Sequence, residues 1–152
     1  MGSLTLFFDR NIGSTIPEAM RSLGLLYVYH HHLNPSACGE KSQPGHRGLF
    51  KPDEQDDVIL RFCGERGWVV VSQDYKYHLQ DNERDAIKQH SVGVFYLWGA
   101  NAPRWETFRV LAIALPKLIT TAENTPRPFI FKVEANSRLR RVSLETSGVP
   151  AT

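Results

Sequence analysis

The stretch LTLFFDRNIG, residues 4–13, decides the fold that the sequence predicts. Its first half, residues 4–8, is apolar or β-branched throughout, and it runs directly into the charged pair Asp9 and Arg10. A short apolar run of this kind is typical of a strand that is covered on both faces. Why a strand of this kind ends on the carboxylate of Asp9 is the first question that the sequence raises.

Three further stretches share this apolar character, and each is four to seven residues long. They are rich in valine and aromatic residues, which favour strands in a covered sheet. These stretches are residues 25–29, 68–71 and 92–98.

Helix signals fill the gaps between the predicted strands. Side chains that can accept hydrogen bonds from a first helical turn stand at Thr15, in a capping box, and at Asp53 and Asn82. Gly24 and Gly67 are expected to end the first two of these helices. Strands that alternate with helices in this way predict βαβ units and a mainly parallel sheet.

The C-terminal third departs from this alternation. A longer helix is expected to open at residues 101–104 and to place Trp105 in the core. Residues 129–134 and 139–144 are interpreted as the two strands of a hairpin. Residues 34–51 mix Pro, Gly, Ser and Lys without a period, which predicts a long loop of a kind that is often functional.

The composition limits the class of protein. A chain of 152 residues suggests one domain, expected over residues 1–146, with a frayed tail at 147–152. Hydrophobic residues make up 41% and the net charge is +2, so no strong basic patch for nucleic acid or membrane is indicated. The two cysteines and the lack of an apolar run of ~18 residues or of an N-terminal leader pattern favour a cytoplasmic protein.

Carboxylates recur at one edge of the predicted sheet. Asp9 and Asp74 each follow a predicted strand, and ligands of an open parallel sheet bind outside the carboxyl ends of its strands. Asp56 stands near the start of the second helix and shares a helix face with Ile59 and Cys63, so it is expected to point toward the sheet. These three acids are therefore expected to converge.

Carboxylates that converge repel one another and take up protons unless a cation neutralises them. Hard oxygen ligands favour Mg²⁺ or Mn²⁺, and such an ion suits the chemistry of phosphodiester bonds. An aspartate after a strand is also frequently a cap or turn residue, and Asp56 would be favoured at a helix start by the helix dipole alone. These residues are therefore compatible with two interpretations, a metal site and a set of structural caps.

The run His30, His31 and His32 also invites a metal interpretation, because imidazole is a common ligand. On an extended chain His30 and His32 would share one face while His31 points away. We interpret the run as polar residues at the rim of a cleft, where they could contact a phosphodiester substrate.

Several segments resemble a known family. The segments LFFDRNI, DDVILRFCGERGWVVVSQDYKY, NERDAI and VGVFYLW are similar to the PIN-like domains, and most similar to the PIN-like toxin ribonucleases of bacterial toxin–antitoxin systems. The resemblance covers residues 4–98. It implies an α/β fold, a three-layer α/β/α sandwich with a central, mainly parallel sheet, to which the C-terminal helix and β-hairpin are added.

The resemblance also implies roles for the acids. By position, Asp9 is the first-strand acid, Asp56 the helix acid and Asp74 the acid after the later strand, and together they would be catalytic and bind Mg²⁺ or Mn²⁺. Asp57 is the nearest competitor of Asp56, and Glu83 falls where a further acid helps in the family. Side chains that could support these acids or contact substrate, or that are simply solvated or paired with the acids, are Asn11, Ser72, Arg10, Lys76 and Arg84.

The function that the resemblance implies is that of a hydrolase, a metal-dependent endoribonuclease that serves as the toxin of a toxin–antitoxin pair. The expected partners are RNA as substrate, a cognate antitoxin protein and, as an open alternative, a second copy of the chain in a homodimer. No membrane partner is expected. The alternative function is a non-catalytic PIN-like module that binds RNA or protein, since members of the family with degraded sites keep the fold.

Overall fold

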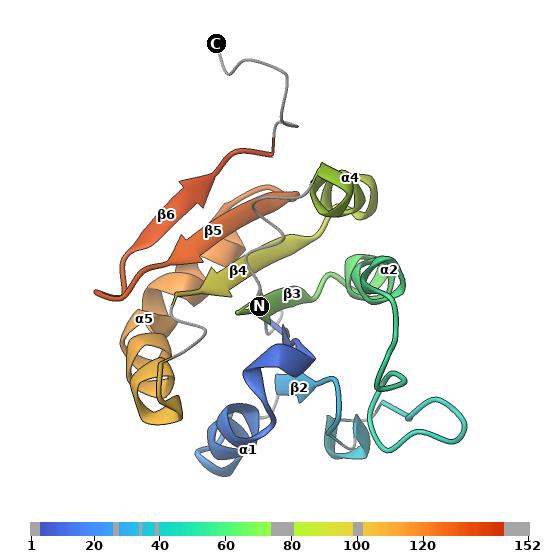
Figure 1. The fold of residues 1–152 in the computed structure, drawn as a ribbon. Coiled ribbons are helices and arrows are strands. Elements are labelled where there is room, and N and C mark those ends of the chain that lie inside the picture. Colours follow the sequence, from blue (N-terminus) through green and yellow to red (C-terminus); the bar gives the residue numbers. More distant parts are fainter. Residues whose placement is uncertain are drawn as a thin grey trace.

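A six-stranded sheet forms the centre of the protein (Figure 1). The computed structural model describes residues 4–25, 28–33, 35–38, 40–73, 81–98 and 102–144. The strand order is β2-β1-β3-β4-β5-β6, with β1 to β5 parallel and β6 antiparallel to β5. The strands are β1 (Leu6–Phe8), β2 (Val28–His30), β3 (Val69–Ser72), β4 (Gly93–Leu97), β5 (Phe129–Val133) and β6 (Leu139–Val142).

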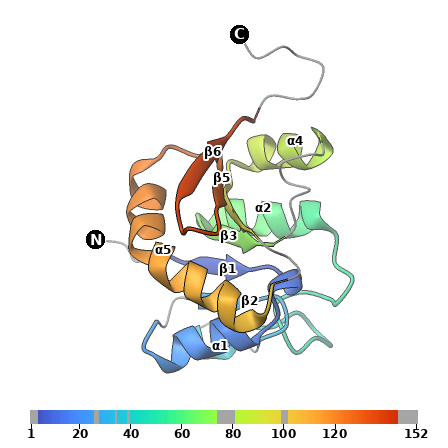
Figure 2. The same ribbon diagram turned by 60° about the vertical axis from the view of Figure 1, so that its left-hand side comes forward.

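Helices cover both faces of this sheet (Figure 1, Figure 2). Two of them pack on one face and two on the other, so the predicted three-layer α/β/α sandwich is confirmed. The first pair is α1 (Thr15–Ser22) and α5 (Arg104–Asn124), and the second is α2 (Asp56–Arg66) and α4 (Asp81–His90). Two short 3₁₀ helices are η1 (Arg10–Ile12) and η2 (Pro35–Cys38). No helix among the described residues is long and apolar enough to span a bilayer.

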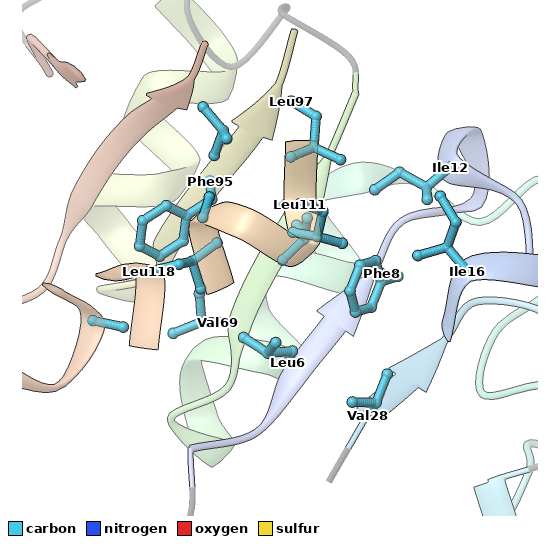
Figure 3. Close-up of a cluster of buried hydrophobic side chains, with 14 of the residues drawn as sticks. Leu6, Phe8, Ile12, Ile16, Val28, Val69, Phe95, Leu97, Leu111 and Leu118 are labelled. Carbon is cyan, nitrogen blue, oxygen red and sulfur yellow. The ribbon is translucent and has the colours of Figure 1, made fainter. Parts of the chain in front are cut away.

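The first strand is buried on both faces, which explains its continuous apolar run. Leu6 and Phe8 belong to the core between the sheet and the α1/α5 layer, shown in Figure 3, whereas Phe7 belongs to the core on the α2/α4 side. Successive side chains of a strand point to opposite faces, so both faces of β1 need apolar residues. The same alternation places Val69 and Val71 in one core and Val70 in the other.

The second strand lies further along the chain than the sequence suggests. Residues 25–29 were expected, but β2 begins at Val28 and extends to His30, which pairs with Phe8 of β1. Leu25 is not part of the strand, because its backbone N–H donates to the Met20 carbonyl at 3.0 Å and closes the end of α1. An apolar side chain at Leu25 therefore belongs to a helix end, where it is exposed.

The helix α2 begins later than its predicted cap. Asp53 was expected to begin it, but the helix begins at Asp56, with Gln55 as its N-cap. The Arg10 guanidinium donates to the carbonyls of Pro52 and Glu54, at 3.2 and 2.9 Å, and these contacts hold the preceding segment outside the helix. The start of α2 is thus set by a contact 42 residues away in the chain, which local helix signals cannot report.

The predicted starts of α1 and α4 differ from the observed ones by one and two residues, and the predicted stop of α2 is correct. Thr15 is the first residue of α1 rather than its cap, which is Ser14, and α4 begins at Asp81, one residue before Asn82. Gly67 ends α2 in the left-handed region, with φ 71°, where glycine is favoured.

The prediction that Trp105 lies in the core is wrong, since its side chain is 70% exposed. The buried stripe of α5 runs through Thr107, Leu111, Ala114 and Leu118. Trp105 stands two residues before Thr107, which places it on the opposite side of the helix.

Candidate active site

Asp9 lies at the carboxyl end of β1 and is buried, with 3% of its surface exposed. Its Oδ1 accepts a hydrogen bond from the Arg10 backbone N–H at 2.7 Å, and its Oδ2 accepts one from the Ser72 hydroxyl at 3.3 Å. Its own N–H donates to the Val71 carbonyl of β3 at 2.9 Å. The carboxylate is therefore held between two neighbouring strands at the edge where a parallel sheet binds its ligands.

Two other predicted residues complete a chain of hydrogen bonds that ends on Asp9. The Asn11 amide group donates to the Ser72 Oγ at 3.2 Å, and the Asn11 Oδ1 accepts from the Gln73 N–H at 3.2 Å. A hydroxyl has one proton to donate, so Ser72 can accept from Asn11 while it donates to Asp9. The structure thus brings Ser72 at the end of β3 together with Asp9 and Asn11, which precede it by 63 and 61 positions.

Gln73 and Thr107, which the sequence did not predict as site residues, extend this network to the α5 layer. The Gln73 amide donates to the Thr107 hydroxyl at 3.4 Å, and Thr107 is buried in the first turns of α5. The signal was a polar threonine on the apolar stripe of a helix. Buried polar groups of this kind almost always have a hydrogen-bond partner, which for Thr107 is Gln73.

The start of α2 separates the two competing acids. Asp56 is the first residue of the helix, and the side chains that share its face, Ile59 and Cys63, are buried against the sheet as expected. Asp57 is turned away, since its side chain is 66% exposed and its Oδ1 lies 3.1 Å from the His90 Nε2. Of the two, Asp56 lies on the buried face of α2, which is the face predicted for the helix acid.

The charge of Asp9 reaches this inner face of α2. Burial raises the pKa of the Cys63 thiol, Arg66 lowers it, and the Asp9 carboxylate raises it further. The Asp9 carboxylate is thus one of the charges that act on Cys63, on the buried face of α2.

The remaining predicted residues are placed differently from one another. The Arg10 side chain donates hydrogen bonds to the carbonyls of Pro52 and Glu54, and it thereby holds the segment before α2 beside Asp9. Glu83 and Arg84 are half-buried in the first turn of α4. Asp74 and Lys76 lie outside the described residues.

The histidine run is not a rim, apart from its last member. His30 and His31 are buried, at 1% and 0% exposure, and only His32 is exposed. The His30 Nδ1 accepts from the His32 N–H at 3.0 Å, and the His31 Nε2 donates to the Lys51 carbonyl at 2.6 Å. The run is buried because β2 continues through His30, beside Phe8.

Both buried imidazoles are neutral. Burial lowers the pKa of His30 to about 3, and the neighbouring His32 and His31 lower it in the same direction. Burial also lowers the pKa of His31, against the opposing effects of the Lys51 carbonyl and the Asp9 carboxylate. Within the described part of the chain no group of three His, Cys, Asp or Glu side chains is placed to hold a metal ion.

The side chains around Asp9 nevertheless have the chemistry that Mg²⁺ or Mn²⁺ prefers. The carboxylate of Asp9, the amide oxygen of Asn11 and the hydroxyl of Ser72 are hard oxygen donors, gathered at one sheet edge. Cys63 is packed in the core, where burial raises its pKa and keeps it a thiol. A donor set of this kind fits a hard cation and not a thiolate-bound one.

Comparison with protein families finds a match over more than half of the chain. A family model described as a PIN-like domain matches residues 4–99, which span the chain from β1 to β4. No curated protein matches the chain, and no solved structure matches it. The resemblance predicted over residues 4–98 is therefore confirmed at the level of the family.

Proposed function

The chain belongs to the PIN-like domain family, and from this premise we propose that it is a metal-dependent endoribonuclease, the toxin of a bacterial toxin–antitoxin pair. PIN-like domains are frequently nucleases. The observation that carries the proposal is the buried carboxylate of Asp9, held by Ser72 and Asn11 at the carboxyl edge of the sheet. Burying a carboxylate lowers the stability of a protein, and buried carboxylates that are held in one orientation are typical of functional sites.

Three acids would hold Mg²⁺ or Mn²⁺ in this proposal, namely Asp9, Asp56 and Asp74. When bound, the ion would supply a water of lowered pKa and neutralise charge on the phosphoryl oxygens. Ser72 and Asn11 would keep the Asp9 carboxylate in one orientation, as their hydrogen bonds indicate. Hydrolysis then needs no side-chain nucleophile, and Lys76 and Arg84 would bind phosphates of the RNA.

The test combines metal binding with cleavage. We would titrate Mn²⁺ into the wild type, Asp9→Asn and Asp57→Asn by calorimetry, and assay each protein on a structured RNA. Asp57→Asn is the matched control, because it removes an exposed carboxylate that pairs with His90. We expect the control to bind and cleave like the wild type, and Asp9→Asn to lose about 100-fold or more in cleavage.

A folded wild type that neither binds Mn²⁺ nor cleaves RNA would contradict the proposal. It would favour the alternative, a non-catalytic PIN-like module that binds RNA or protein. In that case Asp9→Asn should leave the affinity for the partner unchanged.

An antitoxin partner is supported by one exposed apolar surface. The groove between α1 and α5 has a volume of about 360 Å³ and is lined by Thr15, Ile16, Ala19, Arg104, Trp105 and Phe108. Trp105 stacks on Phe108, with ring centroids 6.0 Å apart, and stays largely exposed. Exposed apolar patches mark surfaces that bind other proteins.

The antitoxin proposal can be tested by co-expression with the product of a neighbouring reading frame. Trp105→Ala should weaken capture of that product and leave cleavage by the isolated chain unchanged. Capture that is equally strong with Trp105→Ala would place the partner elsewhere.

A further inference from the structure

A second cavity lies beside the candidate active site, within the long loop that follows β2. Its volume is about 380 Å³. The proposed cleavage chemistry uses none of its side chains. The lining residues are His32, Gly45, His46, Arg47, Gly48, Phe50 and Pro52.

Two contacts tie this cavity to the Asp9 segment. The His31 N–H, next to the lining residue His32, donates to the carbonyl of Phe8 at 3.2 Å, directly before Asp9. Arg10, directly after Asp9, donates to the carbonyl of the lining residue Pro52 at 3.2 Å. The cavity therefore flanks the candidate active site on its β2 side.

The wall of the cavity is preformed. Gly48 packs so closely on β2 that a Cβ there would come nearer than 3.0 Å to the His31 carbonyl oxygen. Phe50 is buried, and its ring meets the Phe7 ring edge-on at 5.6 Å. The hydrogen bond from His31 to the Lys51 carbonyl fixes the same segment. Pockets for small ligands are usually preformed in this way.

The opposite rim is a tight turn that presents basic groups. The His46 N–H donates to the Gln43 carbonyl at 3.0 Å, and Gly45 has a φ of +81°, which glycine adopts without strain. The turn places His46 half-buried and Arg47 exposed at the cavity. Together with His32, the described lining residues offer a guanidinium and two imidazoles, and none of these residues is an acid.

These properties select the class of ligand. A guanidinium and imidazoles donate hydrogen bonds to phosphate oxygens, and flat rings such as imidazole stack on unpaired bases. The volume lies at the lower end of the range of roughly 300–1,000 Å³ that is common for small-molecule sites, which fits a single nucleotide. The described part of the lining favours an anion over a cation, because its charged side chain is the guanidinium of Arg47.

We propose that this cavity binds one unpaired nucleotide of the RNA strand that crosses the candidate active site. Its phosphate lies against Arg47 and His46, and its base lies against the imidazole of His32. The inference rests on the proposed function for the identity of the substrate as RNA. It does not require that cleavage occurs.

The test measures binding without metal, so that cleavage cannot interfere. Fluorescence anisotropy in EDTA gives the affinity of a short labelled single-stranded RNA for the wild type, Arg47→Ala, His32→Ala and Arg61→Ala. Arg61→Ala is the matched control, because the side chain of this α2 arginine is 63% exposed and is not named in the lining of the cavity. We expect Arg47→Ala to weaken binding about tenfold and His32→Ala about fivefold, with Arg61→Ala within about twofold of the wild type.

Competition distinguishes the sources of the phosphate. A nucleoside monophosphate should displace the labelled strand better than inorganic phosphate, and single-stranded RNA should displace it better than a duplex of the same length. Equal competition by inorganic phosphate would reduce the site to an anion site and overturn the proposal. Equal competition by the duplex, an unchanged Arg47→Ala or no binding of RNA by the wild type would also overturn it.

The outcome separates this inference from the proposed function. Cleavage by a wild type whose RNA affinity is insensitive to Arg47→Ala would keep the nuclease and remove the nucleotide site. Binding that depends on Arg47, in a protein that does not cleave with Mn²⁺, would keep the nucleotide site and remove the nuclease.

Discussion

At the scale of single residues, Asp9 answers the question of why a buried strand ends on a carboxylate. The carboxylate receives hydrogen bonds from the Arg10 backbone and from the Ser72 hydroxyl, so its burial is compensated within the fold. Ser72 in turn accepts from Asn11. These contacts define one orientation of the carboxylate, and an oriented carboxylate is what binding of a metal ion requires.

Ser72→Ala should therefore impair cleavage more than it impairs folding. Loss of one hydrogen bond to Asp9 should lower the free energy of unfolding by about 1 kcal/mol and the rate of RNA cleavage about tenfold. Urea unfolding and single-turnover cleavage measure the two effects. Ser22→Ala, at the exposed end of α1, is the control and should change neither. A Ser72→Ala protein that cleaves at the wild-type rate would show that the Ser72 hydroxyl has no positioning role.

His30 should make the protein less stable in mild acid. Its pKa is about 3 in the folded state, chiefly because of burial, and about 6.5 in the unfolded state. Below pH ~6.5 the unfolded chain thus binds a proton at His30 that the folded chain does not bind. The contribution of neutral His30 to the free energy of unfolding is therefore complete above pH ~6.5 and is lost as the pH falls toward 3. Between pH 7.5 and 5.0 the free energy of unfolding should fall by about 2 kcal/mol through this residue.

The measurement compares urea unfolding of the wild type and His30→Asn at both pH values. Asparagine keeps an acceptor for the His32 N–H but cannot titrate, so the loss on acidification should shrink by about 2 kcal/mol. An equal loss in the two proteins would show that other groups cause the acid sensitivity.

At the scale of helices and strands, the sequence predicted the elements well and their boundaries less well. Both faces of β1 and β3 are buried, so their apolar runs report strands directly. The start of α2 depends on Arg10, which binds the carbonyls of Pro52 and Glu54 across the fold. A contact between segments so far apart in the chain leaves no periodic signal in either of them.

The packing of α2 on α4 should depend on Gly64. Alanine is favoured over glycine in a helix by about 1 kcal/mol, but a Cβ at Gly64 would come nearer than 3.0 Å to the backbone carbonyl of His90. A clash with backbone requires the two helices to separate, which typically costs about 1–3 kcal/mol. We expect the clash to prevail, so Gly64→Ala should lower the free energy of unfolding despite its better helix propensity.

Chemical denaturation of Gly64→Ala tests this prediction. Ala112→Gly on the exposed face of α5 is the control for propensity alone, and it should lower the free energy of unfolding by about 1 kcal/mol. A Gly64→Ala protein that is more stable than the wild type would show that α2 and α4 can separate without cost.

At the scale of the whole molecule, the sequence predicted the layered fold and the position of Asp9 at the carboxyl end of the first strand. It did not predict the cavity in the loop after β2, because that cavity depends on the close approach of Gly48 to β2. It also placed Trp105 in the core, because apolar character alone does not say which side of a helix is covered. The side of α5 that is exposed and the close contact of Gly48 both depend on how the layers pack together. The position of Trp105 and the cavity could therefore be found only in the structure.

Binding of a metal ion should stabilise the whole molecule. An ion that binds only the folded state raises the free energy of unfolding by about 2.7 kcal/mol at a concentration of 100 times its Kd. For a domain of this size, that corresponds to a rise in Tm of about 5–10 °C. We expect this rise with Mn²⁺ for the wild type and for Asp57→Asn, and its reversal by EDTA.

Asp9→Asn should unfold at the same temperature with and without Mn²⁺, because the substitution removes a ligand and leaves the fold in place. Asp57 pairs with His90 on the exposed side of α2, so its loss should not alter the response to the metal. Thermal unfolding followed by circular dichroism measures all three proteins without any assumption about the RNA. Equal stabilisation of Asp9→Asn by Mn²⁺ would place the metal elsewhere, and the carboxylate at the end of β1 would then serve only to join β1 to β3 through Ser72.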